Sequence, residues 1–363
     1  MKIQYLLLLL LPFFACDNSG SSSGNDFDRR AMLEHYGQHI IQPAYGTLGS
    51  NTEILKTQSD AFATGLTEAA LLQARTAWRT AYESWQNANA FNFGPGGEEG
   101  TRKSLVEEIG LFPVSESKIE SRIASGAWNM NDFDRDARGF LAVEYLLYGK
   151  NQSTAEVLNA FQVSPNRRQY LNDLVQNLVS RVSDVRTAWS AYYPGFVAND
   201  GTDVGSSTSL LYNEFVRSYE SLKNFKVALP LGKRPGQVQP EPQLVEGFYS
   251  ATSLDMIKRH WASVEHLWYG QDPAGADGPG FREYLASVEG GDMLIGQTEA
   301  QMAVVRSALA AVPANQSLSE LMAAEAPEVV ALNDELQKFT RFIKSDMSSL
   351  LGIAITFASG DGD

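Results

Sequence analysis

The stretch FLAVEYLLYG, residues 140–149, decides how this chain folds. Its last seven residues, VEYLLYG at 143–149, return as VEHLWYG at 264–270, 121 residues further along the chain. An earlier hexapeptide, YESWQN at 82–87, is echoed by YESLKN at 219–224. Two matched pairs in the same order indicate one ancestral unit that is used twice. We therefore expect two structurally related halves.

Each copy of the repeat carries one isolated acid. Glu144 is the only charged residue between Phe140 and Tyr148, and Glu265 is the only acid in residues 261–269. A helix that is apolar on nearly every side is buried, and a buried carboxylate needs a hydrogen-bond partner or a function. We expect Glu144 at the seam between the halves, beside a tyrosine, an arginine or an ordered water. Two interpretations stay open: the two glutamates bind a cation or a polar ligand group, or they are structural.

The N-terminus resembles a bacterial export signal. Lys2 precedes an apolar run at residues 3–14, which is too short for a lasting membrane span but suits a signal peptide. Residues 1–15 are therefore predicted to be a signal peptide and Cys16 the lipid-modified first residue. The alternative is an ordinary signal peptide with an incidental cysteine. Residues 16–26, rich in serine and glycine, read as a flexible tether.

Composition restricts the partners of the chain. With 29 basic and 43 acidic residues the formal charge is −14, and no lysine or arginine cluster stands out along the sequence. This argues against nucleic acid and anionic lipid surfaces as partners. The expected membrane contact is the lipid anchor at Cys16. The predicted location is the bacterial cell envelope, anchored to the outer membrane on its periplasmic or surface face.

Hydrophobic periodicity predicts an all-α fold. Ser164 and Pro165 form a typical helix start, and apolar residues then recur every three or four positions until residues 193–195. Residues 350–357 are rich in β-formers and are either a strand or an extended tail over the core. We expect two tandem antiparallel helical bundles related by a pseudo-two-fold axis, at residues 27–195 and 196–363. The other predicted helices are residues 66–89, 209–227, 293–311 and 325–351.

In these features the chain resembles the imelysin-like proteins of the bacterial envelope. The matching segments cover nearly the whole mature chain: IIQPAY at 40–45, residues 78–85, FNFGP at 91–95, residues 139–149, LPLG at 229–232, residues 264–270 and residues 351–363. The resemblance implies two related helical bundles. It also implies the motif G-x-H-x-x-E, which in the family is the proposed metal or catalytic centre.

That motif is incomplete in this chain. Gly139 and Glu144 occupy its two ends, but Leu141 stands where the family has histidine. Leucine supplies neither an imidazole ligand nor a general base, so the peptidase activity ascribed to the family is weakened for this chain. Glu144 remains the one candidate metal ligand of the motif, with iron or another divalent metal as the candidate cofactor.

Other candidate residues carry weaker signals. His35 and His39 share a helix face without a third metal ligand. His266 adjoins Glu265 and is a candidate ligand contact, whereas His260 lies six residues earlier and points to another side of the helix. Tyr82 is a further candidate ligand contact, although aromatic residues of its helix are more typical of a core.

Two functions follow from these observations. The first is a non-enzymatic, lipid-anchored envelope protein that binds a ligand or metal and, as the resemblance implies, is linked to iron uptake. Its partners are then an iron-bearing ligand or an outer-membrane receptor. The second is a metal-dependent peptidase of the imelysin type.

Overall fold

The computed structural model describes residues 27–98 and 103–357. Every regular element in these residues is helical, and they contain no strand, which confirms the predicted all-α fold. The predicted signal peptide, Cys16 and the tether lie outside the described residues. No helix in the described ranges combines the length and the apolar character needed to cross a membrane.

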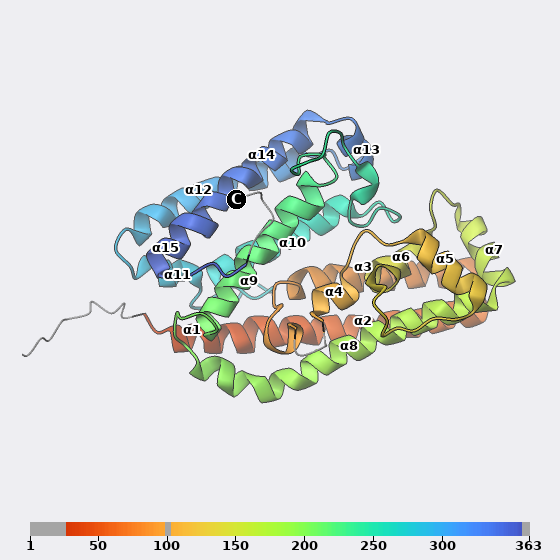
Figure 1. Cartoon of the computed structure of the whole chain (residues 1–363), viewed down its shortest axis with the longest axis horizontal. Helices are drawn as coiled ribbons and strands as arrows, with labels where there is room; N and C mark the ends of the chain where they lie inside the picture. The colour runs from red at the N-terminus through yellow and green to blue at the C-terminus, as the bar shows by residue number, and fades with distance from the viewer. Residues whose placement is uncertain (1–26, 99–102, 358–363) are drawn as a thin grey trace, which may run out of the picture.

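The N-terminal half is built on three long helices, α2, α3 and α8, with α2 packed against both others (Figure 1). A π-helical segment, η1, joins α1 to α2. The helices of this half are α1 (Arg29–His35), η1 (Tyr36–Ile41), α2 (Gln42–Gly65), α3 (Glu68–Ala88), η2 (Gly94–Gly96), α4 (Leu105–Ile109), α5 (Glu116–Ser125), η3 (Arg135–Ala137), α6 (Phe140–Tyr148), α7 (Thr154–Val163) and α8 (Pro165–Ala198).

The C-terminal half lies against the first, with α10 packed on α3 (Figure 1). Two of its helices, α9 and α14, continue into the π-helical segments η4 and η6. The helices of this half are α9 (Ser207–Ser221), η4 (Leu222–Ala228), η5 (Pro242–Leu244), α10 (Ser253–Tyr269), α11 (Phe281–Ala286), α12 (Gly291–Ala311), α13 (Leu318–Ala323), α14 (Pro327–Arg341), η6 (Phe342–Asp346) and α15 (Met347–Leu351).

Helix α8 begins as predicted but ends later. The Ser164 hydroxyl accepts a hydrogen bond from the backbone N–H of Arg167 at 3.2 Å, and Pro165 is the first helical residue. The expected end at residues 193–195 is wrong, because the helix runs through Pro194 to Ala198. Proline removes one backbone hydrogen bond, and burial of Phe196 against Trp189 offsets that loss. The halves are therefore joined by residues 199–206, just beyond the sequence-based boundary at residue 195.

The sequence repeat is visible in the packing of aromatic rings. Tyr82 on α3 contacts Phe140 on α6, with ring centroids 5.1 Å apart. At the matching repeat positions, Tyr219 on α9 contacts Trp261 on α10 at 6.4 Å. Equivalent helices, α3 with α6 in one half and α9 with α10 in the other, therefore pack through equivalent repeat positions. This is expected for a duplicated bundle.

The C-terminal tail is extended rather than a strand. After α15 ends, residues 353–357 run along α9, where Asn213 holds them by two backbone contacts. The Asn213 amide donates to the carbonyl of Ala354 at 3.0 Å, and its oxygen accepts from the N–H of Thr356 at 2.8 Å. This attachment brings Phe357 over Arg217, 4.8 Å from guanidinium carbon to ring centroid. The tail thus reaches the pocket described next.

Candidate functional site

A buried ion pair lies in the seam between the two halves. Lys226 on η4 and Glu246, in the loop before α10, are 2.7 Å apart, and each side chain is only 3% exposed. Two residues of α3 complete the cluster from the other half. The Tyr82 hydroxyl donates to Glu246, and the Gln86 carbonyl accepts from the Lys226 ammonium at 2.6 Å. The pair is therefore hydrogen-bonded from both halves, as a buried pair requires.

Burial perturbs the groups of this cluster. It raises the pKa of Tyr82 well above its usual value, and the charge of Glu246 adds to that effect. It lowers the pKa of Lys226, while the Glu246 carboxylate opposes that change. Tyr82 accordingly stays protonated and acts as a hydrogen-bond donor.

Glu144 lies at the same seam and is fully buried. Its Oε1 atom accepts two hydrogen bonds from Ser250 in the other half, from the backbone N–H at 2.7 Å and from the hydroxyl at 2.6 Å. Its Oε2 atom makes no hydrogen bond within the described residues. Burial raises the pKa of Glu144 to about 7, and the hydrogen bonds from Ser250 limit the rise. The seam position agrees with the sequence, but the expected tyrosine or arginine partner is wrong because Ser250 fills that role.

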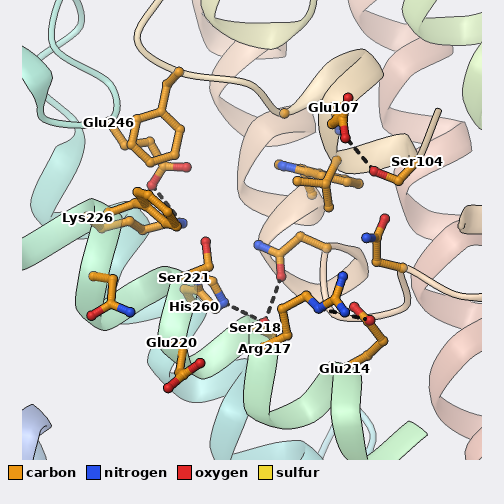
Figure 2. A pocket seen from close by; sticks show the side chains of 18 of the residues that line it. Ser104, Glu107, Glu214, Arg217, Ser218, Glu220, Ser221, Lys226, Glu246 and His260 are labelled. Atoms are coloured by element: carbon orange, nitrogen blue, oxygen red, sulfur yellow. Dashed lines mark hydrogen bonds and ion pairs between the residues drawn. The ribbon is translucent and has the colours of Figure 1, made fainter. Parts of the chain in front are cut away.

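A pocket of about 380 Å³ opens beside the Lys226–Glu246 pair, between the halves. Figure 2 shows charged side chains of both signs around it. Its walls include α3 and α4 on one side and α9, η4 and α10 on the other. Its charged and imidazole-bearing lining residues are Glu107, Glu214, Arg217, Glu220, Lys226, Glu246 and His260, and its aromatic lining residues are Trp85, Phe112, Phe225 and Phe357.

His260 is connected to the buried ion pair by a chain of hydrogen bonds. Because Lys226 can only donate, the Gln86 carbonyl accepts, and the Asn89 amide also donates to it at 3.3 Å. The Asn89 carbonyl then accepts from the Ser218 hydroxyl at 3.2 Å. The His260 Nε2 atom, 2.7 Å from Ser218, must therefore be the donor in that contact.

This chain of bonds leaves the second nitrogen of His260 as an acceptor. Burial lowers the pKa of His260 well below its usual value, and the charge of Lys226 adds to the effect, so the ring is neutral. Its Nδ1 atom has no hydrogen-bond partner within the described residues. The pocket wall therefore contains a buried imidazole with an unused lone pair.

At the other end of the pocket, Glu214 and Arg217 form an ion pair with a nitrogen–oxygen distance of 3.2 Å. Burial raises the pKa of Glu214 to about 7, and Arg217 opposes that rise. Arg217 is half exposed and also lies over Phe357. This pair gives the pocket one partly accessible cation beside one acid that titrates near neutral pH.

Only part of the predicted site gathers at the seam. Glu144 and Tyr82 lie there, close enough for the Glu144 charge to influence the tyrosine. Glu265 instead pairs with Arg306 at 2.6 Å within the C-terminal half. His266 is half-buried at the end of α10, where burial lowers its pKa. The two glutamates thus have separate partners and do not form the expected pair.

The residues around Glu144 do not fit a metal ion. The described ranges contain no group of three or more histidine, cysteine, aspartate or glutamate side chains that could hold one. Leu141, at the histidine position of the motif, is buried in the apolar core. His35 contacts the carbonyl of Gly270 at 2.6 Å and stacks on the exposed His39, so the His35 ring serves the contact between the halves.

Sequence reasoning missed Lys226 and Glu246, and it considered His260 without assigning it to the site. The sequence does indicate that Lys226 is buried, because it is the only charged residue in the apolar run FKVALPL at 225–231. The same argument had identified Glu144. Glu246 and His260 sit in mixed surroundings, and only the packing of α3 against α10 reveals their role.

Comparison with known proteins agrees with this architecture. A family model described as imelysin, Peptidase_M75, matches residues 41–341. Iron-regulated protein A of Synechococcus elongatus is 22% identical over 296 residues, which is 77% of this chain and 75% of that protein.

Two solved structures share the fold. One is a proposed iron-regulated protein A precursor from Parabacteroides distasonis, with a TM-score of 0.72, 18% identity, and coverage of 92% of this chain and 97% of that one. The other is an imelysin-like protein from Psychrobacter arcticum, with a TM-score of 0.71, 18% identity, and coverage of 92% and 99%.

Proposed function

Since this chain belongs to the imelysin family, we propose that it is a non-enzymatic ligand-binding protein of the cell envelope, linked to iron uptake. The observation that carries the proposal is the pocket between the halves, with the Arg217–Glu214 pair in its wall. Such a pocket combines aromatic walls with one accessible cation and one acid, and apolar walls with a few polar groups are the usual composition of a small-molecule site.

The link to iron comes from the relatives. The alignment with this chain covers three quarters of the length of iron-regulated protein A from Synechococcus elongatus. Because the described residues contain no group of three metal ligands, iron enters the proposal as part of a small-molecule complex. Arg217, which is half exposed, suits the anionic groups of such a complex, and the aromatic walls suit its apolar parts.

The anchor and the partners belong to the same proposal. Cys16 carries the lipid, and the tether lets the two bundles reach an outer-membrane receptor that supplies or takes up the ligand. Fatty-acid labelling of the full chain, absent when Cys16 is replaced, tests the anchor.

Binding of ferric citrate tests the pocket. We expect the full chain to retain iron in equilibrium dialysis against ferric citrate, and Arg217→Gln to weaken retention about tenfold, as expected for a lost charge-assisted hydrogen bond. Arg259→Gln is the matched control, because Arg259 is also a half-exposed arginine paired with a glutamate, Glu83 at 2.8 Å, but it does not line the pocket. Equal retention by both variants, or none by the wild type, would refute the pocket assignment.

The alternative is a metal-dependent peptidase, which the family description favours. We expect no cleavage of unfolded protein substrates by the full chain above a chelator-treated background, because Leu141 and Ser250 occupy positions where a metal site at Glu144 needs ligands or space. Zinc-dependent cleavage that Glu144→Gln abolishes would overturn the non-enzymatic proposal.

A further inference from the structure

A second cavity, of about 480 Å³, lies in the C-terminal half. It is formed by η4 and residues 233–235 on one side and by the end of α14 with η6 on the other. Asn224 lines both this cavity and the pocket between the halves. The two are otherwise lined by different residues, so the second cavity is a separate candidate site.

Positive charge converges on this cavity. Its lining includes five cationic side chains and, among the described residues, no acid: Lys223, Lys233, Arg234, Arg341 and Lys344. The whole chain has 29 lysine and arginine residues against 43 acids. Cationic side chains gathered around one cavity create a positive local potential, which attracts anions. In a chain this acidic, the concentration requires an explanation.

Acids behind the lining hold several of these cations in place. Lys344 pairs with Glu220 at 3.0 Å, Lys233 with Glu325 at 2.8 Å and Arg341 with Asp346 at 3.0 Å. These acids are not lining residues of the cavity. The ion pairs therefore position the nitrogen atoms around the cavity while leaving its wall positive.

Buried and polar neighbours add to the site. Lys223 is only 2% exposed, so one cation belongs to the floor of the cavity rather than to its rim. Uncharged side chains with donor groups complete the wall, namely Asn224, Gln337 and Ser345. Cationic nitrogens together with hydroxyl and amide donors are the groups that proteins use to bind oxyanions.

We propose that this cavity binds a compact polyanion whose charged groups are phosphates or carboxylates. A cavity of this volume falls within the range of small-molecule sites and has room for more than one oxyanion. The site is independent of the pocket between the halves and of the function proposed for it.

Inorganic pyrophosphate is the probe, with the full chain titrated in a calorimeter at low salt. We expect saturable binding that weakens about a hundredfold in the double variant Lys233→Gln/Arg341→Gln, because each of the two lost charge-assisted hydrogen bonds contributes about tenfold to affinity. Both side chains are substantially exposed, so the fold should survive their replacement.

The control is the double variant Lys150→Gln/Lys338→Gln. It removes the same charge from two exposed lysines that are also paired with acids, Glu116 and Glu335, and Lys338 lies on α14 itself. Binding unchanged in the control supports the site. Absence of pyrophosphate binding, or equal loss in both variants, overturns it. Phosphatidylglycerol vesicles that displace pyrophosphate assign the anion to a lipid headgroup, and vesicles that do not displace it assign a soluble ligand.

Discussion

Replacing Lys226 by methionine is expected to lower the free energy of unfolding by about 3–5 kcal/mol, which is a large part of the stability of an ordinary domain. Methionine fills the space of the lysine stem but leaves Glu246 with an uncompensated charge inside the seam, where both side chains are 3% exposed. Chemical denaturation of the wild type and the variant at pH 7 measures the difference.

A second substitution should rescue much of that loss. In Lys226→Met/Glu246→Gln the buried charge is gone, and the amide oxygen still accepts the hydrogen bond from Tyr82. Lys338→Met, on the exposed face of α14, is the control and should cost less than about 0.5 kcal/mol. If Lys226→Met lowers the free energy of unfolding by less than about 1 kcal/mol, water reaches Glu246 in the seam and solvates its charge.

Glu144→Gln is expected to flatten the dependence of stability on pH between about 4.5 and 7. Burial raises the pKa of Glu144 from 4.5 to about 7, so in this window the folded state holds a proton that the unfolded state lacks. The contribution of Glu144 is therefore fully present below pH 4.5 and is lost as pH rises through 7. This loss amounts to about 3 kcal/mol, and glutamine, which stays neutral, removes it.

Glu214 provides an internal comparison for this experiment. Its pKa is also raised to about 7 by burial, so the wild type should lose stability through two carboxylates over the same range. Unfolding free energies measured at pH 5, 6, 7 and 8 should fall less steeply with pH in Glu144→Gln, and less steeply still when Glu214→Gln is added. An unchanged slope in Glu144→Gln would show that the carboxylate is solvated in the folded protein.

These two predictions concern groups that also join the halves. Glu144 accepts a hydrogen bond from Ser250 of the other half, and Lys226 donates one to Gln86 across the seam. Through Gln86 and Asn89 the same hydrogen bonds reach His260 in the pocket wall. The seam that stabilises the molecule is therefore also what fixes the tautomer of the pocket histidine.

The sequence by itself determined the helices, the duplication and the burial of Glu144. These features depend on local pattern: a serine–proline helix start at 164–165, apolar residues at helical spacing, and one acid inside an apolar helix. The local pattern predicted a helix end at Pro194, and this is wrong. Helix α8 continues to Ala198, because burial of Phe196 stabilises its last turn. The local pattern also could not decide between strand and tail for residues 350–357, because Asn213, which holds the tail, is far away in the sequence.

The tertiary structure alone decided which charged groups meet. Glu246 joins Tyr82 across 164 residues of sequence, and Lys344 joins Glu220. No lysine or arginine cluster stands out along the chain, yet η4, residues 233–234, the end of α14 and η6 together bring five cations around one cavity. The physical reason is that helical periodicity fixes which face of a helix is apolar, whereas electrostatic partners depend on how helices distant in sequence pack against one another.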